Sequence, residues 1–117
     1  MVDEWSFVFY ESATGRSPVR EYLDRLNDVE AAQVLRELRH LQTAGTDLGM
    51  PHVRRMQGTE LWELRIRGRV QHRIFYVALQ GRRMLLLHSF AKKSHATPLR
   101  EIATAESRLL DYRRRNG

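Results

Sequence analysis

The side chains best suited to chemistry in this 117-residue sequence are cations in its second half. Arg65 and Arg67 lie two residues apart where apolar and polar residues alternate, so both project from one face of a predicted strand. Arg73 lies on the following predicted strand, and the next strand leads directly into Lys92 and Lys93. Cations that converge on one sheet face can stabilise the charge that develops on a phosphate during RNA phosphodiester cleavage. The pattern therefore predicts a phosphate-handling site on the sheet.

A structural interpretation of the same cations stays open. The strand arginines can pair with Glu60, Glu63 or carboxylates of neighbouring helices and only make an outer face soluble. Arg73 lies in a strongly apolar strand, so it can instead be a structural arginine that is paired and partly buried.

Four residues near these cations in the sequence are candidates for the same site. Phe90 offers a ring on which an RNA base can stack, and Arg67 and His95 are expected to contact RNA or its phosphates. His88 is a candidate proton carrier, although a histidine in an apolar strand is more often a hydrogen-bonded core residue.

Other kinds of chemistry find little support in the residue types. The sequence has no cysteine, which excludes disulfides, thiol nucleophiles and cysteine-ligated metals. The five histidines show no spacing typical of a metal site, so no metal is expected. The glycines all fall at predicted turns, and none forms a phosphate-cradling loop. The segment Met1-Val2-Asp3-Glu4 lacks a basic stretch that leads into an apolar one, so no secretory signal is expected.

The distribution of charge points to a polyanionic partner. The formal net charge is +6, but the first 50 residues carry −4 and the remaining residues carry +10. Eighteen of the twenty cations are arginine, whose planar guanidinium binds phosphate oxygens in pairs. A basic half beside an acidic half favours a face that binds nucleic acid, while an unevenly charged solvated surface remains the alternative.

Hydrophobic periodicity predicts one α+β domain over residues 1–117. A strand, a helical hairpin, a three-strand antiparallel meander and a final helix follow one another, so the helices are expected on one face of an antiparallel sheet. Ser17-Pro18 begins the helical hairpin, Asn27 is expected to cap its second helix, and Gly45 ends it. The predicted strands are 5–10, 61–67, 70–79 and 83–90, with a short strand near 52–56, and the final helix begins at 97–98.

Several segments in a fixed order resemble a known toxin family. They are Leu61-Trp62-Glu63-Leu64-Arg65, His72-Arg73-Ile74-Phe75-Tyr76, Leu87-His88-Ser89-Phe90-Ala91-Lys92-Lys93 and Thr97-Pro98 before a closing helix. With the aromatic first strand and Gly15-Arg16-Ser17-Pro18-Val19, they are similar to the HigB-like branch of the RelE/ParE toxin superfamily, and more narrowly to its phage-related members. The resemblance covers nearly the whole chain, and its specificity comes from order and spacing.

This resemblance implies a RelE-like fold and the toxin of a type II toxin–antitoxin pair. Such a toxin is a cytoplasmic endoribonuclease, or mRNA interferase, that inhibits translation by cutting mRNA on the 70S ribosome. Similar toxins use the RNA 2′-hydroxyl beside the scissile phosphate as nucleophile, so no metal and no cofactor are expected. The implied partner is a HigA-like helix-turn-helix antitoxin, through which alone operator DNA is contacted, and no membrane is involved.

The resemblance also assigns roles by motif position. Arg65 and Arg73 would contact the scissile phosphate and stabilise its transition state. Lys92 or Lys93 would assist the leaving group or bind the adjacent phosphate. Many RelE-type toxins place a tyrosine near the start of the final helix, where this sequence has Thr97-Pro98. The general base is therefore open between His88 and His95.

Two other functions remain open at this point. The ParE side of the superfamily inhibits DNA gyrase without cutting RNA. A non-catalytic nucleic-acid-binding module would also use a basic face. The convergent cations favour the ribonuclease over the gyrase inhibitor, and the non-catalytic module stays open.

Overall fold

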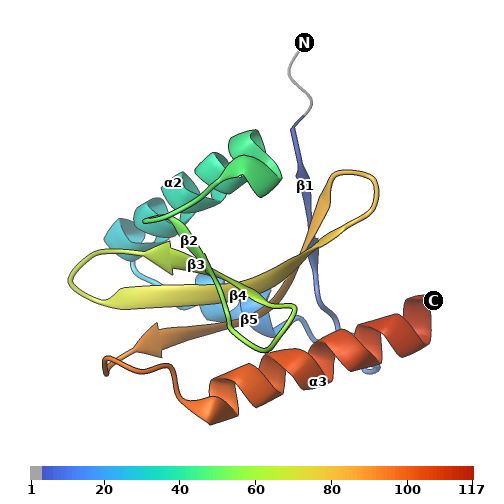
Figure 1. Cartoon of the computed structure of the whole chain (residues 1–117). Helices are drawn as coiled ribbons and strands as arrows, with labels where there is room; N and C mark the ends of the chain where they lie inside the picture. The colour runs from blue at the N-terminus through green and yellow to red at the C-terminus, as the bar shows by residue number, and fades with distance from the viewer. Residues whose placement is uncertain (1–3) are drawn as a thin grey trace.

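The computed structural model describes residues 4–117 and contains three helices and a five-stranded sheet (Figure 1). Residues 1–3, which begin the segment expected to lack a secretory signal, lie outside this range. No helix within 4–117 is long and apolar enough to cross a membrane. The elements, in chain order, are β1 (Ser6–Phe9), α1 (Pro18–Asp24), α2 (Asp28–Ala44), the short 3₁₀ helix η1 (Gly45–Asp47), β2 (Val53–Arg55), β3 (Trp62–Ile66), β4 (Gln71–Leu79), β5 (Arg83–Lys92) and α3 (Leu99–Asn116).

The sheet has the order β1-β5-β4-β3-β2. Strands β2 to β5 pair antiparallel, which confirms the predicted meander, and the α+β class is confirmed as well. The expectation of a wholly antiparallel sheet is wrong, because β1 pairs with β5 in parallel. Residue alternation within a strand reports its buried face but not its direction. The direction of β1 is set by the α1–α2 crossover, which carries the chain to the opposite edge of the sheet.

The helices cover both faces of the sheet, not one face as the sequence predicted. Met84 and Leu86 pack in a core cluster with α2, whereas Leu85 and Leu87 pack in a second cluster with α3. Figure 1 shows α2 and α3 on opposite sides of the sheet. The continuous apolar run in β5 predicts burial on both faces, and a strand of this kind needs a helix on each side.

The two ends of α2 follow from local chemistry. The Asn27 side chain accepts a hydrogen bond from the Glu30 backbone N–H at 2.8 Å, which confirms the predicted cap. At the other end, Gly45 adopts a positive φ of 57°, and a Cβ atom there would lie 2.0 Å from the Trp5 indole nitrogen. Only glycine therefore fits where α2 ends against the segment that leads into β1.

The register of the central strands places two arginines side by side. Arg65 of β3 lies directly opposite Arg73 of β4, and Arg73 lies opposite Phe90 of β5. Gln71, at the start of β4, lies opposite Lys92 at the end of β5. Like charges directly opposite one another destabilise a sheet. A violation of this local rule marks this end of the sheet as a candidate functional site.

Candidate functional site

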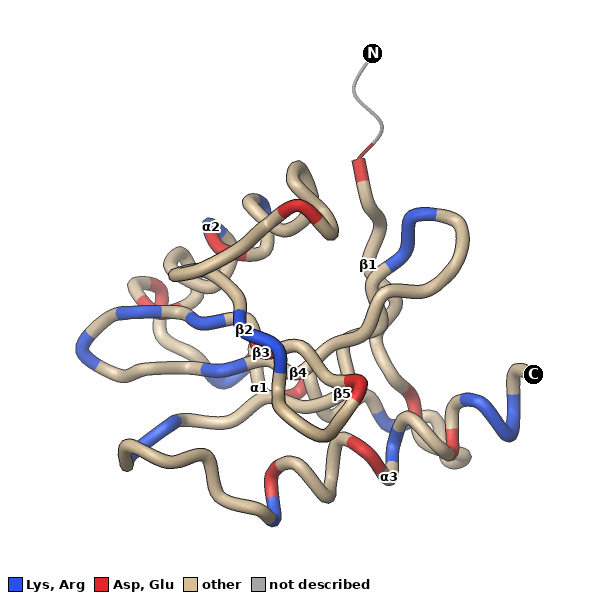
Figure 2. Tube along the Cα trace, in the orientation of Figure 1, with Lys and Arg blue, Asp and Glu red and all other residues tan. Residues whose placement is uncertain are grey.

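One end of the sheet carries a groove of about 680 Å³, which we call the basic groove. Its lining includes six cations and one histidine and no carboxylate. Figure 2 shows these cations along β2, the β3–β4 hairpin and the segment after β5. The residues that define the groove are Arg54, Arg65, Arg69, Val70, Gln71, Arg73, Lys92, Lys93, Ser94 and His95.

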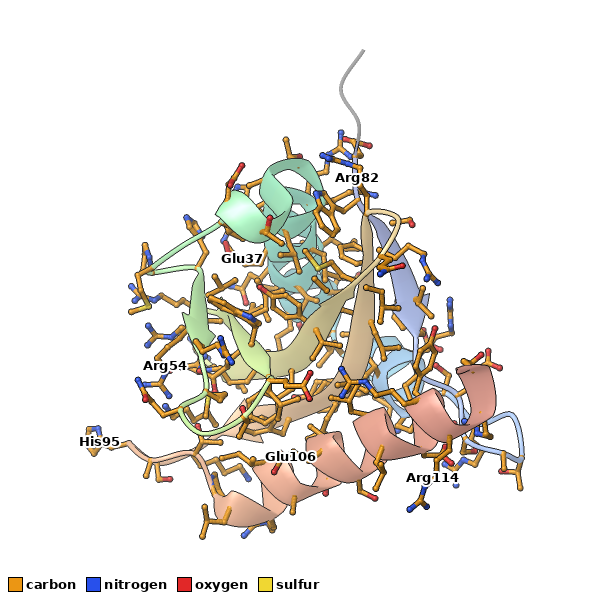
Figure 3. The ribbon with its side chains drawn as sticks, turned by 45° about the vertical axis from the view of Figure 1, so that its right-hand side comes forward. Glu37, Arg54, Arg82, His95, Glu106 and Arg114 are labelled. Atoms are coloured by element: carbon orange, nitrogen blue, oxygen red, sulfur yellow. The ribbon has the colours of Figure 1, made fainter. Side chains whose placement is uncertain are left out.

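Strands and one loop contribute the groove's side chains. β2 provides Arg54, and the β3–β4 hairpin provides Arg65, Arg69 and Arg73. Lys92 ends β5, and the loop from Lys93 to His95 follows it. Figure 3 shows Arg54 and His95 on the same side of the molecule, far from Arg114 at the other end of α3. A groove built mainly on paired strands holds its cations in fixed positions.

Arg73 forms the floor of the basic groove and is almost completely buried, with 1% of its surface exposed. Its Nη1 donates to the His72 carbonyl oxygen at 3.0 Å, and its Nη2 donates to Gln71 Oε1 at 2.9 Å. Its Nε has no hydrogen-bond partner among the described residues. Burial lowers the pKa of the guanidinium, and the nearby Arg65 and Arg54 act in the same direction. Arg73 therefore provides a fixed, poorly solvated positive charge.

The counter-charge for this floor is the fully buried carboxylate of Glu63. Glu63 Oε1 lies 3.7 Å from Arg73 Nε and 3.7 Å from Arg54 Nη2, and neither distance is a hydrogen bond. Thr97, just before α3, donates its hydroxyl to Glu63 Oε2 at 3.3 Å. The structural interpretation placed Glu63 on an outer face. Glu63 is instead buried, and its carboxylate balances part of the charge of Arg73 and Arg54.

The remaining cations lie closer to solvent. Lys92 is half-buried, and burial lowers the pKa of its ammonium, as do Arg73 and Arg54, while Glu63 opposes the shift. Arg65 is also half-buried, and its Nε is buried without a hydrogen-bond partner within residues 4–117. Crowded cations with lowered pKa values and an unused donor favour the binding of an anion.

The structure brings together five of the predicted site residues: Arg65, Arg73, Lys92, Lys93 and His95. Arg67 does not line the basic groove. Arg67 follows the end of β3, is exposed, and lines a neighbouring groove with Arg65, Glu37 and His52. The two arginines that alternation placed on one face therefore share this neighbouring groove, and only Arg65 also lines the basic groove.

His88 and Phe90 also lie away from the basic groove. His88 Nε2 lies 2.7 Å from Glu101 Oε1, and its Nδ1 lies 3.0 Å from Arg108 Nη1, so both ring nitrogens contact α3. Burial lowers the pKa of His88, and Glu101 partly opposes this effect. Phe90 is 5% exposed and packs 5.3 Å from Phe75, ring centroid to ring centroid. Both residues lie outside the groove for one reason. These residues share the sheet face of Arg73, but α3 covers that part of the face.

Two cations of the groove were not predicted from the sequence, and Glu63 was predicted as a partner of the arginines but not as a buried one. Arg54 lies opposite Glu63 in the β2–β3 pairing, and Arg69 lies in the turn between β3 and β4. A short strand near residues 52–56 was expected, but its register against β3 cannot be obtained from three residues. The available signal for Glu63 is its position two residues before Arg65, which places both on one face of the strand.

The comparisons with known proteins bear on the same region. Residues 21–110 match the sequence profile of the phage-derived Gp49-like proteins. This range begins in α1, continues into α3, and contains every residue of the basic groove. No curated protein matches the chain.

Proposed function

The chain belongs to the phage-derived Gp49-like family, which is related to the RelE- and HigB-like toxins, and we propose on this premise that it is a ribosome-dependent mRNA endoribonuclease. The observation that carries the proposal is the basic groove, whose lining has six cations and no carboxylate. A family of this kind implies an antitoxin partner. We propose that this partner is a helix-turn-helix protein of the HigA type, and that operator DNA is reached only through it.

The reaction that fits the groove uses the RNA as its own nucleophile. The 2′-hydroxyl oxygen attacks the adjacent phosphorus, and the bond from phosphorus to the 5′-oxygen of the next nucleotide breaks. The products are a 2′,3′-cyclic phosphate and a free 5′-hydroxyl. One proton leaves the 2′-hydroxyl and one is given to the 5′-oxygen, so the protein must stabilise negative charge and relay protons.

The groove residues are suited to separate parts of this reaction. We assign contact with the scissile phosphate to the guanidinium of half-buried Arg65 and to the exposed ammonium of Lys93. Of the two lysines, we assign proton donation to the leaving oxygen to Lys92, because its pKa is lowered. His95 is exposed at the groove and is our candidate for the general base.

Arg73 would act from the floor without leaving its buried position. Its charge is surrounded by protein and not by water, so its field at the groove is screened less than that of a surface cation. Its hydrogen bonds to the His72 carbonyl and to Gln71 fix the guanidinium before the substrate arrives. Such a preorganised charge needs no rearrangement in the transition state.

The decisive test is cleavage on ribosomes programmed with a defined mRNA. We expect the wild-type protein to generate new 5′ ends inside the ribosomal A site, and Arg65→Gln to cut at least about 10²-fold more slowly, the usual loss for one transition-state donor. Arg114→Gln removes an exposed arginine at the far end of α3 and should cut like the wild type (Figure 3).

Two outcomes would overturn the proposal. One is equal cleavage by the wild type and Arg65→Gln. The other is growth arrest with DNA breaks and intact mRNA after induction, which is the behaviour of a gyrase-inhibiting toxin.

A further inference from the structure

A second cluster of chemistry-bearing side chains lies outside the basic groove. Glu37 and His40 lie one helical turn apart on α2, and His52 lies just before β2. His40 Nδ1 is 3.4 Å from Glu37 Oε1, and His52 Nδ1 is 3.1 Å from Glu37 Oε2. One ligand atom from each residue lies within 4.8 Å of the others. The sequence showed no metal-binding spacing because the third member comes from a different segment, twelve residues beyond His40.

These distances fit the coordination shell of a transition metal. Zn²⁺ binds imidazole nitrogens and carboxylate oxygens at about 2.0–2.2 Å, and a tetrahedral shell then separates neighbouring ligand atoms by about 3.4 Å. The separations of 3.4 and 3.1 Å run to the two oxygens of the Glu37 carboxylate and are close to this spacing, and the second is a hydrogen bond that the ion would replace. To bind an ion, one carboxylate oxygen and one nitrogen of each imidazole must turn toward a common point, and these atoms already lie within 4.8 Å of one another.

The exposure of the cluster leaves access for the ion and for a fourth ligand. The carboxylate-bearing side chain of Glu37 is 13% exposed, whereas those of His40 and His52 are 45% and 37% exposed. Glu37 is thus the most buried of the three residues, and both imidazoles are open to solvent. We propose that Glu37, His40 and His52 bind one divalent transition-metal ion of the Zn²⁺ class, with water in the open position.

The neighbouring charges set the expected strength of this site. Arg36, Arg65 and Arg67 line the same groove as Glu37 and His52, and their positive charges lower the affinity for a cation. Three ligands also bind more weakly than the four of a closed structural zinc site. A dissociation constant in the micromolar range is therefore expected.

The site has a structural consequence for the sheet. It would fasten α2 to the segment that enters β2, and the His52 carbonyl accepts a hydrogen bond from the Arg65 backbone N–H at 2.8 Å. A bound ion would therefore hold the strands that carry Arg54 and Arg65. Because it binds the folded state, the ion is also expected to raise the melting temperature.

The test uses the full-length protein without a polyhistidine tag, titrated with Co²⁺ as a spectroscopic probe and with Zn²⁺ in competition. We expect one ion per chain, visible absorption typical of tetrahedral Co²⁺, and displacement by Zn²⁺. His40→Ala and Glu37→Gln should weaken binding by at least about 10–100-fold, since loss of even an outer partner costs that much. His95→Ala removes an exposed histidine outside the cluster and should bind Zn²⁺ like the wild type.

Folding is controlled independently. His40 is exposed on a helix, and alanine is the best helix former, so His40→Ala should show the circular dichroism and metal-free melting temperature of the wild type. The proposal is overturned if wild-type protein shows no saturable binding at one ion per chain. It is equally overturned if folded His40→Ala binds Zn²⁺ as tightly as wild type, or if His95→Ala loses the ion.

Discussion

Replacement of Arg73 by glutamine tests how the basic groove is held together. The shorter and neutral Arg73→Gln side chain removes the charge that lies 3.7 Å from Glu63 Oε1. It also removes the donors to the His72 carbonyl and to Gln71. Glu63 is fully buried and its Oε1 already lacks a hydrogen bond among the described residues, so its charge would lose most of its compensation.

The structure also sets the size of the effect. Removal of one partner from a buried ion pair costs about 3–5 kcal/mol in the free energy of unfolding. Glu63 would retain Arg54 at 3.7 Å and the Thr97 hydroxyl at 3.3 Å, and the repulsion between Arg65 and Arg73 would disappear. We therefore expect the lower end of the range, about 3 kcal/mol. For a domain of this size, that loss lowers the melting temperature by roughly 10 °C.

The assay is urea unfolding of wild type, Arg73→Gln, Glu63→Gln and the double variant. The double variant contains neither buried charge, so it should be more stable than Arg73→Gln alone. The double-mutant cycle should therefore give a clear coupling energy between Arg73 and Glu63. Two results would refute this reasoning. In the first, Arg73→Gln lies within about 0.5 kcal/mol of wild type, as surface substitutions do. In the second, the two single losses simply add.

Three further predictions address the groove and its surroundings. Arg65→Gln should keep a melting temperature close to that of Arg114→Gln, because Arg65 is half-buried and forms no ion pair with a carboxylate among the described residues. A large loss of stability would instead show that its effect on cleavage is structural. Single-stranded RNA should bind with a steep salt dependence, and Lys93→Gln should reduce the slope of log K against log salt by about 0.7, the value for one phosphate contact; an unchanged slope would remove Lys93 from the interface. Burial lowers the pKa of His88, so just below pH ~6.5 the unfolded chain binds more protons than the folded protein. The free energy of unfolding, measured with urea at several pH values, should therefore fall as the pH decreases through that window. It should fall less in His88→Gln, which lacks the titrating ring.

The parts of the fold that the sequence predicted are those governed by local patterns. Alternation gave the buried face of β3, and the side-chain oxygen of Asn27 identified the start of α2. The direction of β1 and the placement of helices on both faces depend on contacts between distant segments, for which local patterns contain no signal. The continuous apolar run from Met84 to Leu87 requires that helices cover both faces of the sheet. It is a better guide to the position of the helices than the order of helices and strands along the chain.

The same division applies to the candidate site. Residue type and strand parity identified Arg65 and Arg73 as neighbours on one sheet face, and the register places them directly opposite one another. Parity could not show how far α3 extends over that face, and this extent separates the covered His88 from the open groove. Strand parity also could not show that Glu63 is buried, because a carboxylate on the same strand face as Arg65 can be either solvated or buried.

The electrostatics of the groove connect its stability to its occupancy. The lowered pKa values of Arg73 and Lys92 show that the folded protein holds these cations at a free-energy cost, which Glu63 offsets only in part. An anion in the groove relieves that cost, so any polyanion that binds there must also stabilise the folded state. An RNA phosphate and an acidic segment of an antitoxin would satisfy the same groups. An antitoxin that contributes carboxylates to this groove would therefore inhibit cleavage by direct competition and stabilise the bound toxin at the same time.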